Sequence, residues 1–260
     1  GDDSLSEEMI AGWQAEGVGT AKVARLRGKL PGLYLIETDA RGERKFFHWR
    51  ESAAARQLMS LPETDAILRS LAGYDLVYLS AITLSIYDAP GRARLLAVLS
   101  DARRSGTRIA FDTNFRARGW PDLDIARDVF AQAFAAADIA LASTEDLLPL
   151  WRDASHHAVL AHIASPEAVL KLAEPASLVR FNGDIHEVRA EPLTSPVVDT
   201  TAAGDSYAAA YLAARLAGAD AVEAARTGHR LAGVVVCYPG AIIPRSAMPD
   251  PGIVKREAAK

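Results

Sequence analysis

Residues 197–211 hold the side chains whose types and order could do chemistry. Small residues, Ala202, Ala203 and Gly204, lie there between a strand-like run and an alanine-rich helical pattern. If the helix starts near Ala203, its unpaired N–H groups and the positive end of its dipole face an approaching phosphate. Asp205 then lies in the first turn, where a carboxylate can accept the proton of an attacking hydroxyl. The pattern favours phosphoryl transfer with Asp205 as the catalytic base.

A capping role is the alternative for the carboxylates of this stretch, because Asp beside a helix start often only caps the helix. The complete string Asp199-Thr-Thr-Ala-Ala-Gly-Asp205 argues against that alternative. It resembles the Asp-Thr-x-Gly-Ala-Gly-Asp signature of the ribokinase family of sugar kinases. It departs at Ala202, which replaces the first glycine of the signature. We expect the extra methyl group to leave a tight anion loop and to crowd the phosphates slightly.

The resemblance extends over nearly the whole chain, and within the family it is strongest to kinases of 2-keto-3-deoxygluconate, also called 2-dehydro-3-deoxygluconate. It implies transfer of the γ-phosphoryl group of ATP, with Mg²⁺, to a terminal hydroxyl of this sugar acid, giving the 6-phosphate. It also implies that Ala202, Ala203 and Gly204 form the anion hole, and that Thr200 and Gly204 contact ATP.

Two segments, residues 28–36 and 47–54, resemble the lid of that subgroup, in which a tyrosine and an arginine contact the sugar acid. By this match Tyr34 and Arg50 are substrate residues. His48 falls where related enzymes often carry an aromatic hydroxyl, and it is a further substrate candidate.

Arg116 is the candidate partner of the substrate carboxylate or of the migrating phosphate. It ends the segment Phe111-Asp-Thr-Asn-Phe-Arg116, which resembles the Asp-x-Asn-x-Arg stretch of the subgroup. A guanidinium stays charged and binds a carboxylate with two parallel hydrogen bonds, and ligands bind at the carboxyl ends of parallel strands. The alternative for any single Arg is a solvated surface charge.

The remaining candidates are also implied by the resemblance. Residues 143–146 correspond to an Asn-x-x-Glu element that orients magnesium. Ser143 replaces the amide of this element. Either Glu145 or Asp146 would supply its carboxylate and bind the metal through water. Lys171 corresponds to a lysine near the nucleotide, although a surface lysine is the alternative and Ala173 replaces the next glycine. Gly240 and Ala241 would touch adenine through backbone atoms, whereas the apolar spacing before them is also typical of a core helix.

Short apolar runs alternate with helical patterns along the chain, which is typical of βαβ units. We predict an α/β fold of the ribokinase-like type: a mostly parallel sheet with helices on both faces, in three α/β/α layers, plus a small β lid hairpin at about 32–50. A second hairpin, with an Asn-Gly turn, is expected at the far edge of the sheet. The expected strands are 75–80, 108–112, 138–142 and 168–172, and the expected helices are 91–104, 122–136 and 156–163.

Length and composition narrow the class of protein. The 260 residues suit a single domain over 1–260, and the net charge of −4 offers no basic field for nucleic acid. No apolar run is long enough to span a membrane, and the lone Cys237 excludes an internal disulfide and a cysteine-based zinc site. We expect a cytoplasmic homo-oligomer that binds a small sugar acid and ATP. We also expect an unstructured tail from about Pro249.

The resemblance implies that a glycine-containing sugar-binding segment and the first strands precede Gly1. We therefore expect the chain as printed to be unstable or nearly inactive when expressed alone.

Three other functions stay open at this point. A ribokinase-like kinase of a neutral sugar, such as fructose or ribose, would not need paired arginines. A catalytically weakened sugar-acid-binding homologue would fit Ala202, Ala173 and Ser143. A nicotinamide-dependent oxidoreductase would need a Gly-x-Gly-x-x-Gly segment after an early strand, and this sequence has none.

Overall fold

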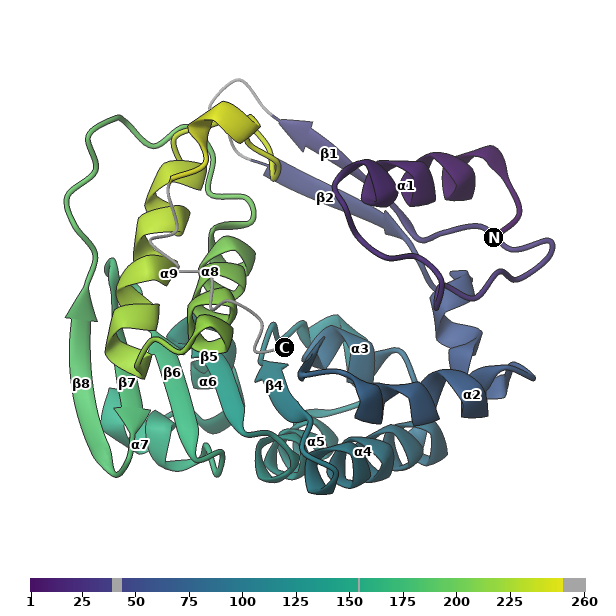
Figure 1. The fold of residues 1–260 in the computed structure, drawn as a ribbon, viewed down its shortest axis with the longest axis horizontal. Helices are drawn as coiled ribbons and strands as arrows, with labels where there is room; N and C mark the ends of the chain where they lie inside the picture. Colours follow the sequence, from purple (N-terminus) through teal and green to yellow (C-terminus); the bar gives the residue numbers. More distant parts are fainter. Residues whose placement is uncertain (39–43, 154, 250–260) are drawn as a thin grey trace, which may run out of the picture. The chain divides into compact units, whose positions relative to one another are not determined.

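The computed structural model describes residues 1–38, 44–153 and 155–249 (Figure 1). The chain forms two compact units, the first from residues 1–74 and 83–107 and the second from residues 75–82 and from 108 onward. The predicted tail beyond Pro249 and the tip of the predicted lid hairpin, residues 39–43, lie outside the described residues. A single domain over 1–260 stays a prediction.

The second unit contains a six-stranded sheet whose strands lie in chain order. The first four strands are parallel, and the last two form an antiparallel hairpin at the edge, as predicted. Asn182 and Gly183 connect this hairpin with φ angles of 53° and 90°, the left-handed conformation of a tight hairpin turn. The strands are β3 (Leu76–Ser80), β4 (Arg108–Asp112), β5 (Ile139–Ser143), β6 (Glu167–Lys171), β7 (Ala176–Phe181) and β8 (Asp184–Arg189).

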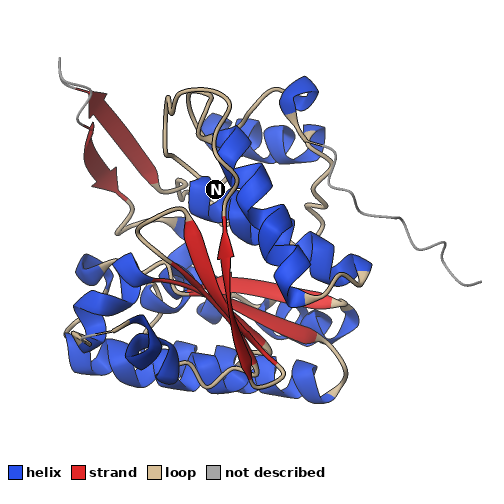
Figure 2. Ribbon diagram, turned by 90° about the vertical axis from the view of Figure 1, so that its left-hand side faces the viewer, coloured by secondary structure: helices blue, strands red, loops and turns tan. Residues whose placement is uncertain are grey.

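Helices cover both faces of this sheet, which confirms the predicted three-layer α/β/α fold (Figure 2). The helices of the second unit are α5 (Leu123–Ala136), α6 (Thr144–Trp151), α7 (His156–Ala161), α8 (Ala203–Ala217) and α9 (Ala221–Val235), with short 3-10 turns η3 (Ala117–Gly119) and η4 (Arg245–Ala247). Helix α6 was not predicted, because it is short and contains Pro149.

Side chains alternate across the strands and separate the two cores. Phe111 of β4 lies edge-to-face against Phe130 and Phe134 of α5, with ring centroids 5.6 and 5.5 Å apart. The next residue back along β4, Ala110, faces the other side of the sheet and belongs to the buried apolar cluster that contains Tyr211 of α8. Helices α5 and α8 therefore cover opposite faces of β4.

A buried ion pair anchors α8 to the sheet. Arg215 donates to both carboxylate oxygens of Glu167, at 2.9 and 2.6 Å, and the Tyr211 hydroxyl donates to the same carboxylate at 2.5 Å. The Glu167 side chain is only 7% exposed. Three bonds to one buried carboxylate fix the C-terminal half of the helix, and Gly218 follows it with a φ of 96°.

The first unit contains the predicted hairpin, β1 (Leu33–Thr38) and β2 (Arg44–Trp49), with Tyr34 opposite His48. Leu33, Leu35 and Trp49 are each more than half exposed. The other elements are α1 (Ser4–Ala15), η1 (Ala54–Ser60), α2 (Thr64–Arg69), η2 (Ser70–Gly73) and α4 (Ala89–Arg104), and α3 (Ala81–Ser85) runs from the second unit into the first.

Candidate active site

The small-residue loop enters α8 through a strained residue. Ala202 has φ 62° and ψ 12°, in the left-handed region, and α8 starts at Ala203 as predicted. The missing glycine therefore matters for the backbone conformation, which favours glycine, and the expected slight crowding of the phosphates stays a prediction.

The Asp199 side chain accepts hydrogen bonds that fix the backbone of this loop. One of its carboxylate oxygens accepts the Thr201 N–H at 2.8 Å, and the other accepts the Gly240 N–H at 2.9 Å. The Ala203 N–H reaches the Thr200 carbonyl at 3.3 Å. The loop before α8 and the loop after α9 are therefore tied to one carboxylate.

Gly204 and Asp205 are exposed in the first turn of α8, so an incoming substrate can reach them. The Asp205 carboxylate lies near enough to influence Asp112 and Tyr78 electrostatically. These observations fit a catalytic base at the mouth of a helix, and the role itself stays a prediction.

Strand register brings three further side chains to the same end of the sheet. Tyr78 pairs with Ala110, Ser80 with Asp112 and Ser143 with Lys171. Because side chains two residues apart share a face, Tyr78, Asp112 and Lys171 extend from the face that carries α8. This is the carboxyl edge of the parallel strands, where ligands bind in open α/β sheets.

Lys171 lies between a buried carboxylate and the start of α8. Its Nζ is 3.8 Å from Asp112 Oδ2, and the two side chains are 18% and 4% exposed. A methyl group placed on Gly204 would lie only 3.4 Å from the same Nζ. Lys171 is therefore not a solvated surface lysine, and its ammonium faces the backbone of the predicted anion hole.

Burial raises the pKa of Asp112, and the nearby Asp146 and Asp205 carboxylates raise it further, against the lowering effect of Lys171 and of the Asn114 N–H. Burial also raises the pKa of Tyr78, and the charges of Asp112 and Asp205 add to this. The Tyr78 hydroxyl therefore keeps its proton.

The predicted magnesium element is the start of α6. Ser143 caps this helix by accepting the Asp146 N–H at 3.1 Å. The Asp146 carboxylate accepts the Thr113 hydroxyl at 2.7 Å and the Phe115 N–H at 2.9 Å. Asp146 thus holds the loop that carries Arg116.

Arg116 follows β4 with 56% of its side chain exposed. Its Nη1 donates to the Phe115 carbonyl at 2.7 Å and lies 3.6 Å from Asp146 Oδ1. The remaining N–H groups of the guanidinium keep donor capacity for an anion.

Magnesium fits this site only as an ion held largely by phosphates and water. Glu145 is exposed, whereas both oxygens of Asp146 already accept protein donors. Within the part of the chain that the structure describes, no cluster of three or more His, Cys, Asp or Glu side chains could hold a metal. A contact through water from Glu145 or Asp146 stays a prediction.

The substrate candidates of the first unit lie on its hairpin. Tyr34 and His48 form a cross-strand pair with ring centroids 6.2 Å apart. Arg50 follows the second strand directly, and its Cβ lies opposite Gly32. Tyr34, His48 and Arg50 are all exposed.

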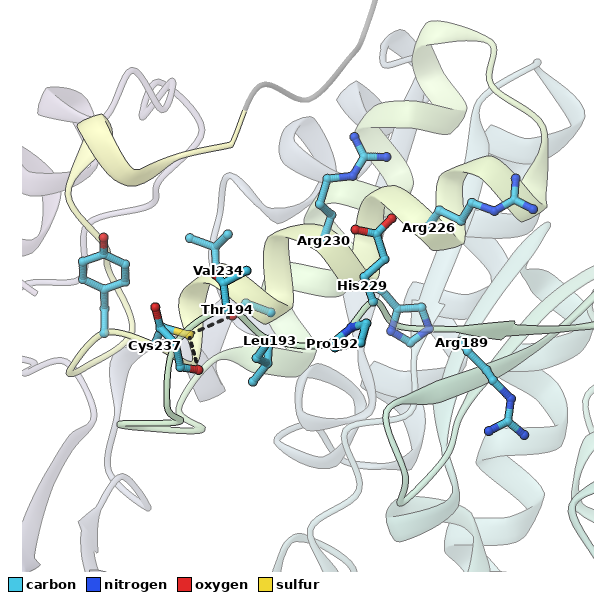
Figure 3. A pocket seen from close by; sticks show the side chains of 13 residues that line it. Arg189, Pro192, Leu193, Thr194, Arg226, His229, Arg230, Val234 and Cys237 are labelled. Carbon is cyan, nitrogen blue, oxygen red and sulfur yellow. Dashed lines mark hydrogen bonds between the residues drawn. The ribbon is translucent and has the colours of Figure 1, made fainter.

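A pocket of about 420 Å³ lies beside α9 in the second unit (Figure 3). Arg226, His229 and Arg230 line it on the helix side, and Cys237 lies at its other end. His229 is fixed by Ser177 at 3.0 Å, and burial lowers the pKa of this histidine, so its ring is neutral at pH 7. The remaining lining residues are Arg189, Glu191, Pro192, Leu193, Thr194, Ser195, Gly233, Val234 and Tyr238.

The two residues predicted to touch adenine do not line this pocket. Gly240 has a φ of 80°, which favours glycine, and it gives its N–H to Asp199. Ala241 is exposed in the same loop. Sequence reasoning missed the pocket because its lining comes from a polar loop and from one face of α9.

Sequence reasoning also left out Tyr78 and Asp112. A signal for Asp112 was present, since it is the polar residue that ends the apolar run of β4, as Lys171 ends that of β6. Only the strand register shows that these two side chains meet.

Among the residues that the structure describes, no helix is both long enough and apolar enough to cross a membrane.

Comparison with known proteins adds independent information. Residues 1–248 match the pfkB family of carbohydrate kinases. The chain is 46% identical over 254 residues to the 2-dehydro-3-deoxygluconokinase of Dickeya dadantii, covering 96% of this chain and 82% of that protein. It is 41% identical to the enzyme of the same name from Escherichia coli, with the same coverage. The solved aminoimidazole riboside kinase of Salmonella enterica shares the fold, with a TM-score of 0.78 at 20% identity over 96% of this chain and 81% of that one.

Proposed function

This chain belongs to the pfkB family of carbohydrate kinases, and from that premise we propose that it transfers the γ-phosphoryl group of ATP to 2-dehydro-3-deoxygluconate. The product is the 6-phosphate of this sugar acid. The observation that carries the proposal is an exposed Asp205 in the first turn of α8, beside a small-residue loop with an ammonium facing it. The similarity to two kinases of this sugar acid supports the substrate.

In this mechanism Asp205 accepts the proton of the terminal hydroxyl as the hydroxyl attacks phosphorus. Of the predicted anion-hole residues, Ala202 and Gly204 are our candidates for N–H groups that stabilise the charge developing on the transferred group, an effect worth about 3 kcal/mol for one well-placed donor. The Ala203 N–H already donates to the Thr200 carbonyl at 3.3 Å. Lys171 adds a positive charge on the same side of the loop. Mg²⁺ bound with ATP would neutralise further phosphate charge, with Glu145 or Asp146 as its contact through water.

In the second unit, Arg116 is our candidate for binding the substrate carboxylate or the migrating phosphate. In the first unit, Tyr34, His48 and Arg50 stay substrate candidates on the resemblance alone. The Arg116 side chain is 56% exposed, and Arg50 is also an exposed residue. A neutral sugar would leave these charges unmatched, so the arginines favour an acidic substrate.

We place the base of ATP in the pocket beside α9. Its end at Cys237 and Tyr238 adjoins the anion loop, because the Val198 and Asp199 N–H groups both donate to the Val236 carbonyl. Cys237 is the only cysteine of the chain, so modification by a maleimide reports on this pocket alone. ATP should slow that modification, Cys237→Ser should show no labelling, and equal rates with and without ATP would remove the base from this pocket.

We also propose that the chain forms a homo-oligomer through the first unit's hairpin. A two-stranded hairpin is marginally stable by itself, and this one exposes Leu33, Leu35 and Trp49. A second copy of the same hairpin would cover that apolar face.

A coupled assay with ATP and a panel of sugars tests the substrate proposal. The panel contains 2-dehydro-3-deoxygluconate, its galactonate epimer, gluconate, fructose and ribose. Turnover should be confined to the 2-keto-3-deoxy acids. Preference for fructose or ribose would instead favour the neutral-sugar kinase, and absence of turnover with every sugar would favour the weakened homologue.

A further inference from the structure

The position of the Lys171 ammonium raises the question of what holds it there. A lysine stem has four flexible carbons, and an unpaired ammonium would turn toward water. This ammonium instead faces Gly204, with no side chain between them. An anion that binds the N–H groups of the first turn of α8 would meet it there.

The Asp112 carboxylate is the one anionic group paired with Lys171 among the described residues. Its two oxygens have different neighbours, since Oδ1 accepts the Asn114 N–H at 3.0 Å and Oδ2 faces Lys171 at 3.8 Å. The Tyr78 hydroxyl lies near enough for the Asp112 charge to raise its pKa, in addition to the effect of burial. The carboxylate is therefore held by its own loop and lies beside the ammonium that extends from β6.

A purely structural role does not require a negative charge at this position. An asparagine would accept the Asn114 N–H equally well, and it would avoid burying a charge beside the carboxylates of Asp146 and Asp205. What asparagine could not do is attract an ammonium by charge. The charge is therefore needed for Lys171 rather than for the loop.

We propose that Asp112 is a positioning residue that holds the Lys171 ammonium against the first turn of α8, where the ammonium neutralises charge on the transferred phosphate. This inference rests on the proposed kinase function for its catalytic consequence, and on the geometry alone for its effect on phosphate binding.

A double-mutant cycle of Asp112→Asn and Lys171→Met tests the coupling. Lys171→Met should lower kcat about 100-fold, comparable to the loss of one preorganised donor. Asp112→Asn should lower kcat about tenfold with little change in KM for the sugar, because an unguided ammonium visits the productive position less often. The double variant should be no slower than Lys171→Met alone.

Asp138→Asn is the matched control, because Asp138 accepts a backbone N–H from Ile109 at 2.8 Å, as Asp112 does from Asn114. It should leave kcat unchanged. The proposal would be overturned if the fold-losses in kcat of Asp112→Asn and Lys171→Met multiplied in the double variant. A normal kcat for Asp112→Asn would also overturn it.

Calorimetric binding of inorganic tripolyphosphate gives a second readout that needs no sugar and no turnover. Affinity should fall in Asp112→Asn, and this fall should disappear when Lys171 is already Met. If every sugar fails in the kinase assay but this coupling is found, the proposed function fails and the positioning role stands. Unchanged tripolyphosphate affinity in Asp112→Asn would contradict the positioning role.

Discussion

Ala202 shows how one residue of the site combines binding geometry with strain. Its left-handed conformation lets the chain turn sharply into α8, so that the following N–H groups point out of the helix. The conformation costs a non-glycine residue about 1–2 kcal/mol. The surrounding hydrogen bonds of Asp199 hold it in place.

Ala202→Gly should therefore stabilise the protein. Relief of the strain, about 1–2 kcal/mol, exceeds the extra entropy of glycine in the unfolded chain, about 0.4–1 kcal/mol. The expected net gain is about 0.5–1 kcal/mol in the free energy of unfolding, measured by urea denaturation. Ala209→Gly, at an exposed position inside α8, is the control and should lose about 1 kcal/mol. A loss of stability in Ala202→Gly would contradict the assigned backbone conformation.

Asp112 gives the site a pH-dependent cost in stability. Its pKa is raised in the folded protein above the ordinary value of 3.8, so the folded state binds this proton more tightly than the unfolded state. The protonated carboxyl therefore adds to the free energy of unfolding of the wild type at low pH. This stabilisation is lost as pH rises from about 4 through the raised pKa.

Asp112→Asn cannot titrate at this position. The difference in the free energy of unfolding, variant minus wild type, should increase from about pH 4 to pH 7, whatever its constant offset from the unpaired Lys171. Denaturation of both proteins at several pH values measures this. A difference that falls with pH would mean that the folded protein depresses the pKa of Asp112.

At the residue scale, the motif led from sequence to Asp205 and Gly204, because a local string indicates where a helix begins and what it can bind, whereas Lys171 was proposed only from the resemblance to a family lysine. It could not lead to Asp112, whose importance depends on a pairing between strands distant in sequence. Nor could it show that Asp146 caps a loop through the Thr113 hydroxyl and the Phe115 N–H.

At the element scale, α8 carries both the anion hole and the catalytic candidate, so its attachment to the sheet sets their positions. Glu167, Tyr211 and Arg215 make this attachment far from the helix start. Arg215 also lies over the Phe181 ring, 5.0 Å from its centroid. The helix is therefore anchored at its far end and carries its exposed first turn at the carboxyl edge of the sheet.

Glu167→Gln should destabilise the protein by about 3 kcal/mol, because it leaves the Arg215 charge buried without its partner. Thermal and urea denaturation measure the loss. Glu223→Gln is the matched control, since Glu223 pairs with Arg226 on the surface at 3.0 Å and should cost less than about 1 kcal/mol. Equal losses in the two variants would contradict the role of the buried ion pair.

Most strands and the longer helices could be predicted, because apolar runs and helical periodicity are local signals. The hairpin at the sheet edge could be predicted too, because the Asn-Gly dipeptide at 182–183 is a local turn signal. Helix α6 could not be predicted from Ser143-Thr-Glu-Asp146, which has the composition of a ligand-binding loop as well as of a helix start. Tertiary packing of Leu147 and Leu150, both fully buried, decides in favour of the helix.

At the scale of the whole molecule, the hairpin of the first unit exposes an apolar face that a partner would cover. Leu33 and Leu35 are 53% and 55% exposed on one strand, and Trp49, opposite Leu33, is 60% exposed. Sequence indicated the hairpin but not this exposure, because apolar alternation alone does not reveal whether a face is covered.

Leu35→Lys should shift the protein toward monomer, since a charge in the covered face opposes association. Sedimentation velocity over a range of concentrations measures the shift. Leu148→Lys is the control: Leu148 is 37% exposed in the second unit, away from the hairpin strands in sequence, and its replacement should leave the association state unchanged. A wild-type chain that stays monomeric at all concentrations would contradict the proposed oligomer.

The central claim concerns the chemistry of Asp205 and is tested most directly by single-turnover phosphoryl transfer in Asp205→Asn. Asparagine can cap a helix as aspartate does but cannot accept the hydroxyl proton, so the variant separates the catalytic role from the capping alternative. Asp220→Asn, a change in the residue that caps α9, is the control and should transfer normally. We predict that Asp205→Asn binds ATP normally and transfers its phosphoryl group about 1,000-fold more slowly than wild type. Transfer at a near-normal rate in this variant would contradict the account.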